Sequence, residues 1–145
     1  MVFKINISEK SGKTYKLEVG GDGLSEKELG NKISGIEVSS DLEGYELQIM
    51  GASDKSGFTS MENVEGMGLK RVLLTYGKGM HKKPKGDKKK NSKSPGLRLR
   101  KIVRGKVISG DVVQINMKVL KEGSKKLGDI FPEQNQPKEV EEKKG

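Results

Sequence analysis

The chain has 145 residues, no Cys and a net charge of +9, which fits one domain and excludes disulfides and Cys-based metal sites. It contains no apolar run near the roughly 20 residues that a membrane span needs, and its first residues lack the profile of a secretion signal. We therefore expect a cytoplasmic protein that makes no contact with a membrane.

The first expected elements are two strands that form a hairpin. In residues 2–8 the apolar side chains of Phe3, Ile5 and Ile7 alternate with polar ones, and residues 14–19 alternate in the same way. Alternation with a period of two is typical of a strand with one buried face. A short Gly-containing turn between the two segments predicts a hairpin.

Residues 24–29 carry the pattern of a helix start. The hydroxyl of Ser25 can accept the N–H of Glu28, and Glu28 can reach back to Ser25, which is the capping-box arrangement. Leu24 and Leu29 stand where a hydrophobic staple requires apolar residues. Because Gly35 is a suitable C-terminal stop, we expect one short helix here.

The remaining expected strands are spread over the rest of the chain, at residues 36–38, 45–50, 69–76 and 111–120, with looser alternation around residues 97–102. Residues 51–68 are expected to form a long loop. About six short strands, one short helix and many Gly turns favour a mostly β fold, which we predict to be a small closed or nearly closed β-barrel. An open sheet with the helix packed across it is the alternative.

Two domain-level expectations follow from the same pattern. Residues 1–130 should form a single barrel-like domain. Residues 131–145 are polar and charged, a composition that predicts a disordered tail.

The positive charge is concentrated in one part of the chain. Residues 1–69 carry seven basic and twelve acidic side chains, whereas residues 70–126 carry nineteen basic and three acidic ones. The densest part is residues 77–106, which hold thirteen Lys or Arg side chains and one acid, Asp87. Because one-sided charge costs self-repulsion, it predicts a polyanionic partner, and we interpret residues 77–106 as a nucleic-acid-binding segment.

The candidate RNA-binding residues are the cations of this segment: Lys78, Lys82, Lys83, Lys85, Lys88, Lys89, Lys90, Lys93, Arg98, Arg100, Lys101, Arg104 and Lys106. Residues 82–94 include no apolar side chain, so we expect a solvated, mobile loop in the free protein. Arg98, Arg100 and Arg104 lie beside apolar residues and should be held by the fold. Since positioned Arg side chains lose less entropy on binding, they should supply the specific part of the RNA affinity.

No catalytic site is predicted. His81 is the only His, and a lone His in a basic loop is more typical of a surface residue than of a catalyst or a metal ligand. The spacing of Gly105 and Gly110 matches the two Gly of a P-loop, but Asp111 stands where Lys is required and would repel phosphate. We therefore expect no enzyme activity, no cofactor and no metal.

One further run is distinctive, and its residues are Gly51, Ala52, Ser53, Asp54, Gly57 and Phe58. It resembles the signature of the S6e family of archaeal and eukaryotic small-subunit ribosomal proteins. The resemblance continues in order through Val64-Glu65-Gly66, Arg71-Val72-Leu73-Leu74, the basic segment, Val103-Arg104-Gly105 and Val113-Gln114-Ile115-Asn116. It covers residues 1–125.

The chain departs from the family pattern in three ways. Thr59-Ser60 replace the usual Pro-Met, and the basic segment is longer and richer in Lys. The basic C-terminal extension of eukaryotic relatives, with its phosphorylated serines, is missing, so their regulation by phosphorylation cannot be carried over to this chain. The resemblance implies a structural constituent of the small ribosomal subunit that binds ribosomal RNA. Such a protein would be a monomer within the particle and would contact neighbouring ribosomal proteins. A free RNA- or DNA-binding chaperone is the alternative.

Overall fold

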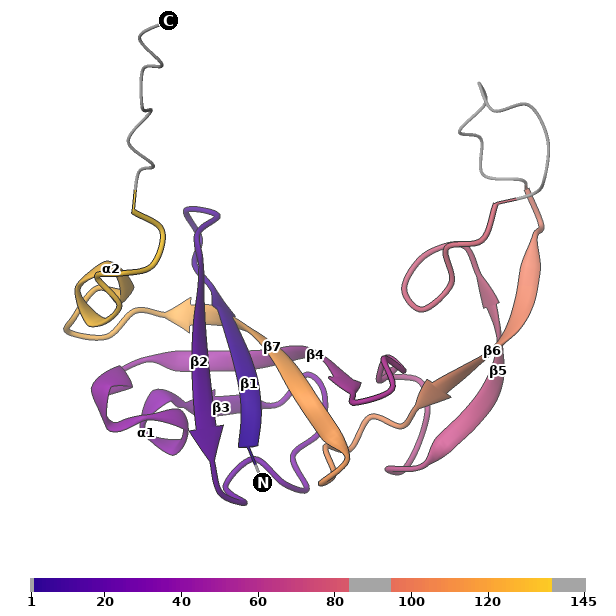
Figure 1. Ribbon diagram of the computed structural model, residues 1–145, viewed down its shortest axis with the longest axis horizontal. Coiled ribbons are helices and arrows are strands. Elements are labelled where there is room, and N and C mark those ends of the chain that lie inside the picture. Colours follow the sequence, from indigo (N-terminus) through magenta and orange to yellow (C-terminus); the bar gives the residue numbers. More distant parts are fainter. Residues whose placement is uncertain (1, 84–94, 137–145) are drawn as a thin grey trace, which may run out of the picture.

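The computed structural model describes residues 2–83 and 95–136, and strands dominate it (Figure 1). The strands are β1 (Val2–Ser8), β2 (Thr14–Gly20), β3 (Lys32–Ser34), β4 (Glu46–Asp54), β5 (Leu69–Thr75), β6 (Arg98–Arg104) and β7 (Val112–Lys121). The helices are one turn long: α1 (Gly35–Val38), α2 (Leu127–Ile130) and a 3-10 turn at Ser40–Leu42. The predicted mostly β class is confirmed.

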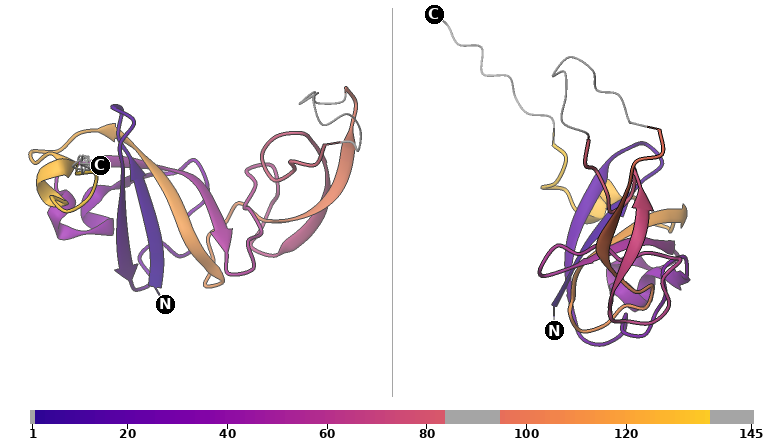
Figure 2. Two further views of the ribbon diagram at one scale, coloured as in Figure 1. Left: turned by 45° about the horizontal axis from the view of Figure 1, so that its top comes forward. Right: turned by 90° about the vertical axis from the view of Figure 1, so that its right-hand side faces the viewer.

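Five strands form one sheet in the order β2-β1-β7-β4-β3, in which β1 and β7 run parallel and the other neighbours run antiparallel. The sheet curls into a half-barrel around the core. Strands β5 and β6 form a separate two-stranded sheet. They form a hairpin, called the arm below, that projects away from the sheet in Figure 1 and in the left view of Figure 2.

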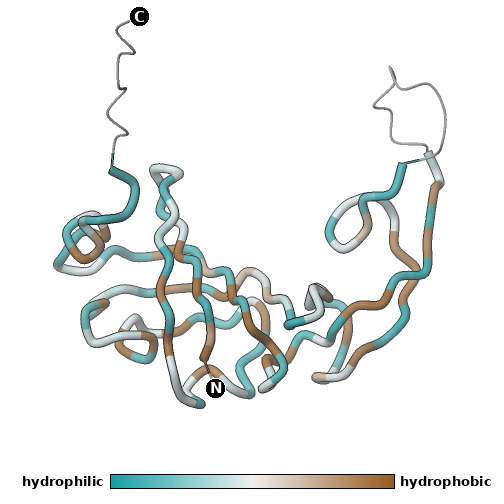
Figure 3. Tube along the Cα trace, in the orientation of Figure 1, coloured by the Kyte–Doolittle hydropathy of each residue, from teal (hydrophilic) through white to brown (hydrophobic). Residues whose placement is uncertain are grey.

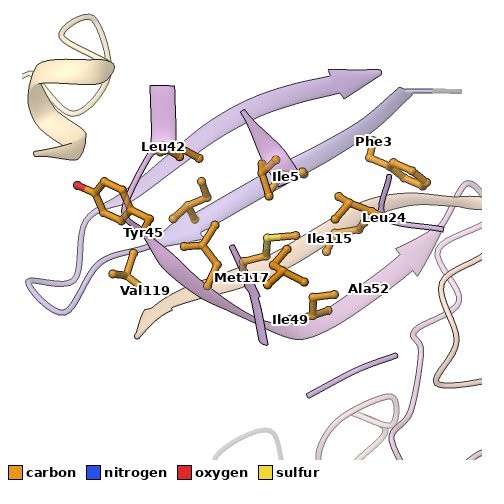
Figure 4. Packing of buried hydrophobic residues seen from close by; sticks show 14 of the residues in the cluster. Phe3, Ile5, Leu24, Leu42, Tyr45, Ile49, Ala52, Ile115, Met117 and Val119 are labelled. Atoms are coloured by element: carbon orange, nitrogen blue, oxygen red, sulfur yellow. The ribbon is translucent and has the colours of Figure 1, made fainter. Parts of the chain in front are cut away.

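The core lies on the concave side of the sheet and is almost entirely aliphatic. Phe3, Ile5 and Ile7 of β1 and Ile115 and Met117 of β7 are fully buried, and Figure 4 shows side chains from several strands meeting in one space. Apolar and polar residues alternate along these strands (Figure 3). The register predicted for residues 2–8 and 111–120 from alternation is therefore confirmed.

The predicted helix at residues 24–29 is wrong. The segment forms turns, and Glu26 has a left-handed backbone with a φ of 66°. Its backbone bonds to residues 106–108 instead: the N–H of Glu26 donates to the carbonyl of Ile108 at 3.0 Å, and the N–H of Ile108 donates to Lys27 at 2.8 Å. These bonds satisfy the backbone groups that a helix would have paired locally, and Leu24 is buried in the core all the same.

The predicted strand at residues 36–38 is also wrong, because these residues belong to helix α1 and the strand lies just before them, at β3. Gly35 starts the turn under tight packing, since a Cβ atom there would lie 2.1 Å from the carbonyl oxygen of Leu42. Strand β4, by contrast, is longer than predicted. It continues through residues 51–54, which were expected to open a loop, with a register shift between Ile49 and Gly51.

Residues 131–136 lie along the edge of β2. The Phe131 ring stacks on Tyr15 with the centroids 5.9 Å apart. The side-chain amide of Gln134 accepts the N–H of Lys16 at 2.7 Å and donates to its carbonyl at 2.8 Å, as a neighbouring strand would. This contact covers part of an otherwise open strand edge.

Two predictions fall largely outside the described residues: the mobile loop at residues 82–94 and the disordered tail, of which residues 137–145 are not described. Within the described part of the chain, no helix is long and apolar enough to cross a membrane.

Candidate nucleic-acid interface

The arm presents a set of exposed cations on two paired strands. Lys70 and Arg71 of β5 lie opposite Val103 and Ile102 of β6, and Arg100 lies opposite Leu73. The side chains of Lys70, Arg71, Arg98, Arg100 and Lys101 are all exposed. No acidic residue occurs between Glu65 and Asp87 or between Asp87 and Asp111. The described part of the arm therefore carries positive charge that no acid of its own offsets.

A buried ion pair fastens the arm to the sheet. Arg104, the last residue of β6, is 8% exposed, and its Nη2 and Nε lie 2.9 and 3.1 Å from Oδ2 of Asp54 at the end of β4. Nη1 also donates to the carbonyl of Met67 at 3.1 Å. Every nitrogen of this guanidinium is thus engaged within the protein.

Asp54 also shapes the turn that follows β4. Its Oδ1 accepts the N–H of Phe58 at 2.8 Å, and its own N–H donates to the Phe58 carbonyl at 3.1 Å. Burial raises the pKa of Asp54, but the hydrogen bond from Phe58 and the guanidinium of Arg104 outweigh burial and hold this pKa below its usual range. The carboxylate is therefore charged at neutral pH.

A second set of contacts closes the same junction. A Cβ atom at Gly105 would lie 1.8 Å from the carbonyl oxygen of Gly66, so these backbones approach as closely as Gly allows. The ammonium of Lys106 lies 3.1 Å from Glu65 and 3.4 Å from Glu28. Its hydrogen bonds to Glu65 and then Glu28 raise the pKa of Lys106.

Beside the junction lies a hollow of about 430 Å³. Its walls are the turn at residues 56–59, residues 100–103 of β6, Arg71 and Gly79. Asp54 holds two of these walls, because one carboxylate oxygen binds Phe58 in the turn and the other binds Arg104 at the end of β6. Three cations, Arg71, Arg100 and Lys101, contribute to its lining.

The structure separates the predicted RNA-binding residues into three groups. Lys78, Lys82, Lys83, Arg98, Arg100 and Lys101 are exposed. Lys85, Lys88, Lys89, Lys90 and Lys93 lie outside the described residues. Arg104 and Lys106 form the third group, whose charges are already paired within the protein. Arg104 is buried against Asp54, and Lys106 pairs with Glu65 and Glu28.

Lys70 and Arg71 were missed because they precede the basic segment in the sequence. The signal that could have found them is the strand predicted at residues 69–76. Pairing this strand with the end of the basic segment in a hairpin places both residues beside Lys101 and Arg100.

His81 is exposed and contacts the ring of Tyr76 edge to face, with the centroids 5.8 Å apart. Among residues 2–83 and 95–136, no three His, Asp or Glu side chains are grouped so that they could hold a metal ion. Among the described residues, the exposed cations of the arm are therefore the candidate functional site.

Comparison of the sequence with known proteins identifies the family of the chain. The family model of ribosomal protein S6e matches residues 3–132. The chain belongs to the ribosomal protein S6e family. It is thus a ribosomal protein, a structural rather than a catalytic component.

Relatives of the chain within the S6e family are named "Small ribosomal subunit protein eS6" and come from archaea. The protein from Methanococcus maripaludis strain C7 is 43% identical over 129 residues, which are 88% of this chain and 94% of the relative. That from Archaeoglobus fulgidus is 38% identical over 140 residues, or 94% of this chain and all of the relative. That from Methanobrevibacter smithii is 38% identical over 132 residues, covering 90% and 93%.

Three of the motifs through which the sequence resembles the S6e family meet at one place in the fold. Asp54 comes from the signature run, Gly66 from Val64-Glu65-Gly66, and both Arg104 and Gly105 from Val103-Arg104-Gly105. Their contacts are the ion pair and the close backbone approach described above. In this S6e chain, the signature therefore builds the joint that orients the arm.

Proposed function

We propose that the chain is a structural constituent of the small ribosomal subunit, in cytoplasmic ribosomes, and that it binds ribosomal RNA through the cations of the arm and of the basic segment. The observation that carries the proposal is the exposed set Lys70, Arg71, Arg98, Arg100 and Lys101, on a hairpin that a buried ion pair fastens to the sheet. Lys and Arg side chains placed close together neutralise closely spaced phosphates and release their counterions.

The arm and the basic segment have different parts in this proposal. Lys82, Lys83 and the cations that follow them supply long-range attraction that is insensitive to sequence. Arg98 and Arg100 stand on a paired strand, so less conformational entropy is lost when they bind, and a guanidinium can fork onto one phosphate. The arm therefore supplies the specific part of the RNA affinity, and the sheet holds the arm in position.

The partners proposed for the chain are small-subunit ribosomal RNA and neighbouring ribosomal proteins, with one copy of the chain in each particle. The names of the archaeal relatives support the assignment to the small subunit. No cofactor is part of the proposal.

The test is a titration of native ribosomal RNA against salt with two matched triple variants. Replacing Arg98, Arg100 and Lys101 with Gln should weaken binding and lower the log–log salt slope by roughly 0.7 to 0.9 for each phosphate that is no longer neutralised. The control replaces three exposed cations of the sheet, Lys4, Lys32 and Lys118, and removes the same charge. Equal losses of affinity in the two variants would mean that net charge, rather than the arm, governs binding.

A second measurement separates the ribosomal role from that of a free chaperone. The tagged chain should sediment with the small subunit in a gradient and stay there at moderate salt. A chain found only in the soluble fraction would favour the chaperone.

A further inference from the structure

We propose that the hollow beside the arm is a binding site for one unstacked nucleotide of the bound RNA. The phosphate would lie on Arg71 and Arg100, which the strand register places on the same face of the arm, and the base would stack on Phe58. This inference rests on the proposed function, because it assigns one subsite within the RNA interface.

The charge of the hollow indicates the class of ligand. In the described part of the chain, Arg71, Arg100 and Lys101 have no acidic partner within ion-pair distance, whereas Arg104 and Lys106 nearby are both paired. Cations that line one concave space focus a positive potential there and raise the local concentration of anions. The charge of the lining therefore favours an occupant that carries negative charge.

The size and lining of the hollow narrow the class further. A volume of about 430 Å³ lies within the range of about 300–1,000 Å³ that small-ligand sites occupy, so the space holds more than a bare phosphate. The half-buried Phe58 is part of the lining, and an aromatic ring is the platform on which unstacked bases are held. Ser56 and Thr59 add hydroxyl groups that can donate or accept hydrogen bonds.

The walls are also held in place before any ligand binds. Asp54 joins the Phe58 turn to the end of β6 through its two carboxylate oxygens. The backbone of Arg104 accepts from Met61 and donates to Thr59, at 3.0 and 2.9 Å, which ties the same turn to the same strand. A preorganised site loses less entropy on binding, which suits a subsite that selects one unpaired position of the RNA.

The first test compares a single-stranded RNA of about ten nucleotides with a duplex of the same sequence. Phe58→Leu keeps an apolar side chain but loses the ring, so it should lower the affinity for the single strand by about five- to 100-fold. Its affinity for the duplex and its salt slope should stay at the wild-type values. Lys82 is an exposed cation outside the lining, so Lys82→Gln should lower the affinities for the single strand and the duplex together.

A stability measurement and a second variant guard against a folding artefact. The melting temperature of Phe58→Leu is measured beside that of the wild type. Arg71→Gln changes an exposed side chain, so it leaves the fold intact and should also reduce the preference for the single strand. If neither variant shifts the ratio of single-strand to duplex affinity, the nucleotide subsite is overturned.

The second test locates the contact directly. A strand carrying 4-thiouridine is irradiated with the full chain, and the modified peptides are identified by mass spectrometry. Cross-links should fall within residues 56–59 or 100–103. Cross-links confined to other segments would overturn the subsite, as would equal displacement of the RNA strand by an acidic peptide of matched charge, which would assign the hollow to a protein.

The two proposals fail in different ways. A wild-type chain that binds neither RNA would refute ribosomal RNA binding by the arm. A wild-type chain that binds both RNAs with a steep salt dependence, but whose affinities do not respond to Phe58→Leu or Arg71→Gln, would refute the subsite alone.

Discussion

Asp54 and Arg104 lie 50 residues apart in the sequence and form a buried ion pair between the sheet and the arm. Oδ2 of Asp54 accepts from both Nη2 and Nε of Arg104, at 2.9 and 3.1 Å. Both side chains are almost wholly removed from solvent. Because both charges are removed from water, each is stabilised mainly by the other. Removing one side chain would leave the other as a buried charge without a counter-charge.

Asp54→Ala should therefore lower the free energy of unfolding by about 3–5 kcal/mol, measured by urea denaturation. Amide hydrogen exchange in β5 and β6 should show the arm loosened more than the sheet. The control is Asp111→Ala, since Asp111 is 78% exposed and 3.6 Å from the same guanidinium, and exposed pairs contribute less than about 1 kcal/mol. Similar losses of stability from the two variants would contradict the assignment of the anchor to Asp54.

Acid should weaken the anchor in a defined direction. The pKa of Asp54 is lower in the folded chain than its usual value, so ionised Asp54 stabilises the fold. This contribution is complete above the unfolded pKa of about 3.9 and is lost as the pH falls through the folded pKa. The difference in melting temperature between wild type and Asp54→Asn should be constant from neutral pH down to about pH 5. Below about pH 5 this difference in melting temperature should become smaller. If the difference has already disappeared above pH 5, the pKa of Asp54 is raised in the folded chain rather than lowered.

Gly105→Ala should destabilise the junction strongly. The added Cβ would lie 1.8 Å from the carbonyl oxygen of Gly66, which is backbone and cannot rotate away, so β6 or the Gly66 turn must shift. Overpacking of this kind costs about 1–3 kcal/mol or more. Gly68→Ala is the matched control, because nothing lies within 4 Å of a Cβ there. Thermal melts in which Gly68→Ala is the more damaging change would refute the close approach.

Substitution by Asp should have different effects on the two faces of β7. Met117 is 1% exposed in the core, whereas its neighbour Lys118 is exposed. Met117→Asp buries an unpaired carboxylate at a cost of several kcal/mol, comparable to the stability of a small domain, and should unfold the chain. Lys118→Asp should stay folded, with a circular dichroism spectrum like that of the wild type. Equal decreases of melting temperature would mean that β7 has the other register.

The sequence alone was enough to predict β1, β2, β4 and β7 of the sheet, the strand at residues 69–76, the basic segment and the family. Strong local signals carry each of these. A period of two specifies which face of β1 or β7 is buried, whatever it packs against. Charge clustering predicts a polyanion-binding segment without reference to fold, and the spacing from Gly51 to Phe58 marks the S6e signature.

Only the tertiary structure decided which residues do what at the junction. Residues 24–29 have a valid capping box, yet backbone bonds to residues 106–108 replace the helix, because long-range pairing satisfies the same groups while burying Leu24. Arg104 resembles Arg98 and Arg100 in the sequence, but it alone of the three reaches a buried carboxylate. The hollow is likewise assembled from segments that are far apart in the chain. Such assignments depend on which residues the fold brings together, and local propensity and charge pattern carry no information about that.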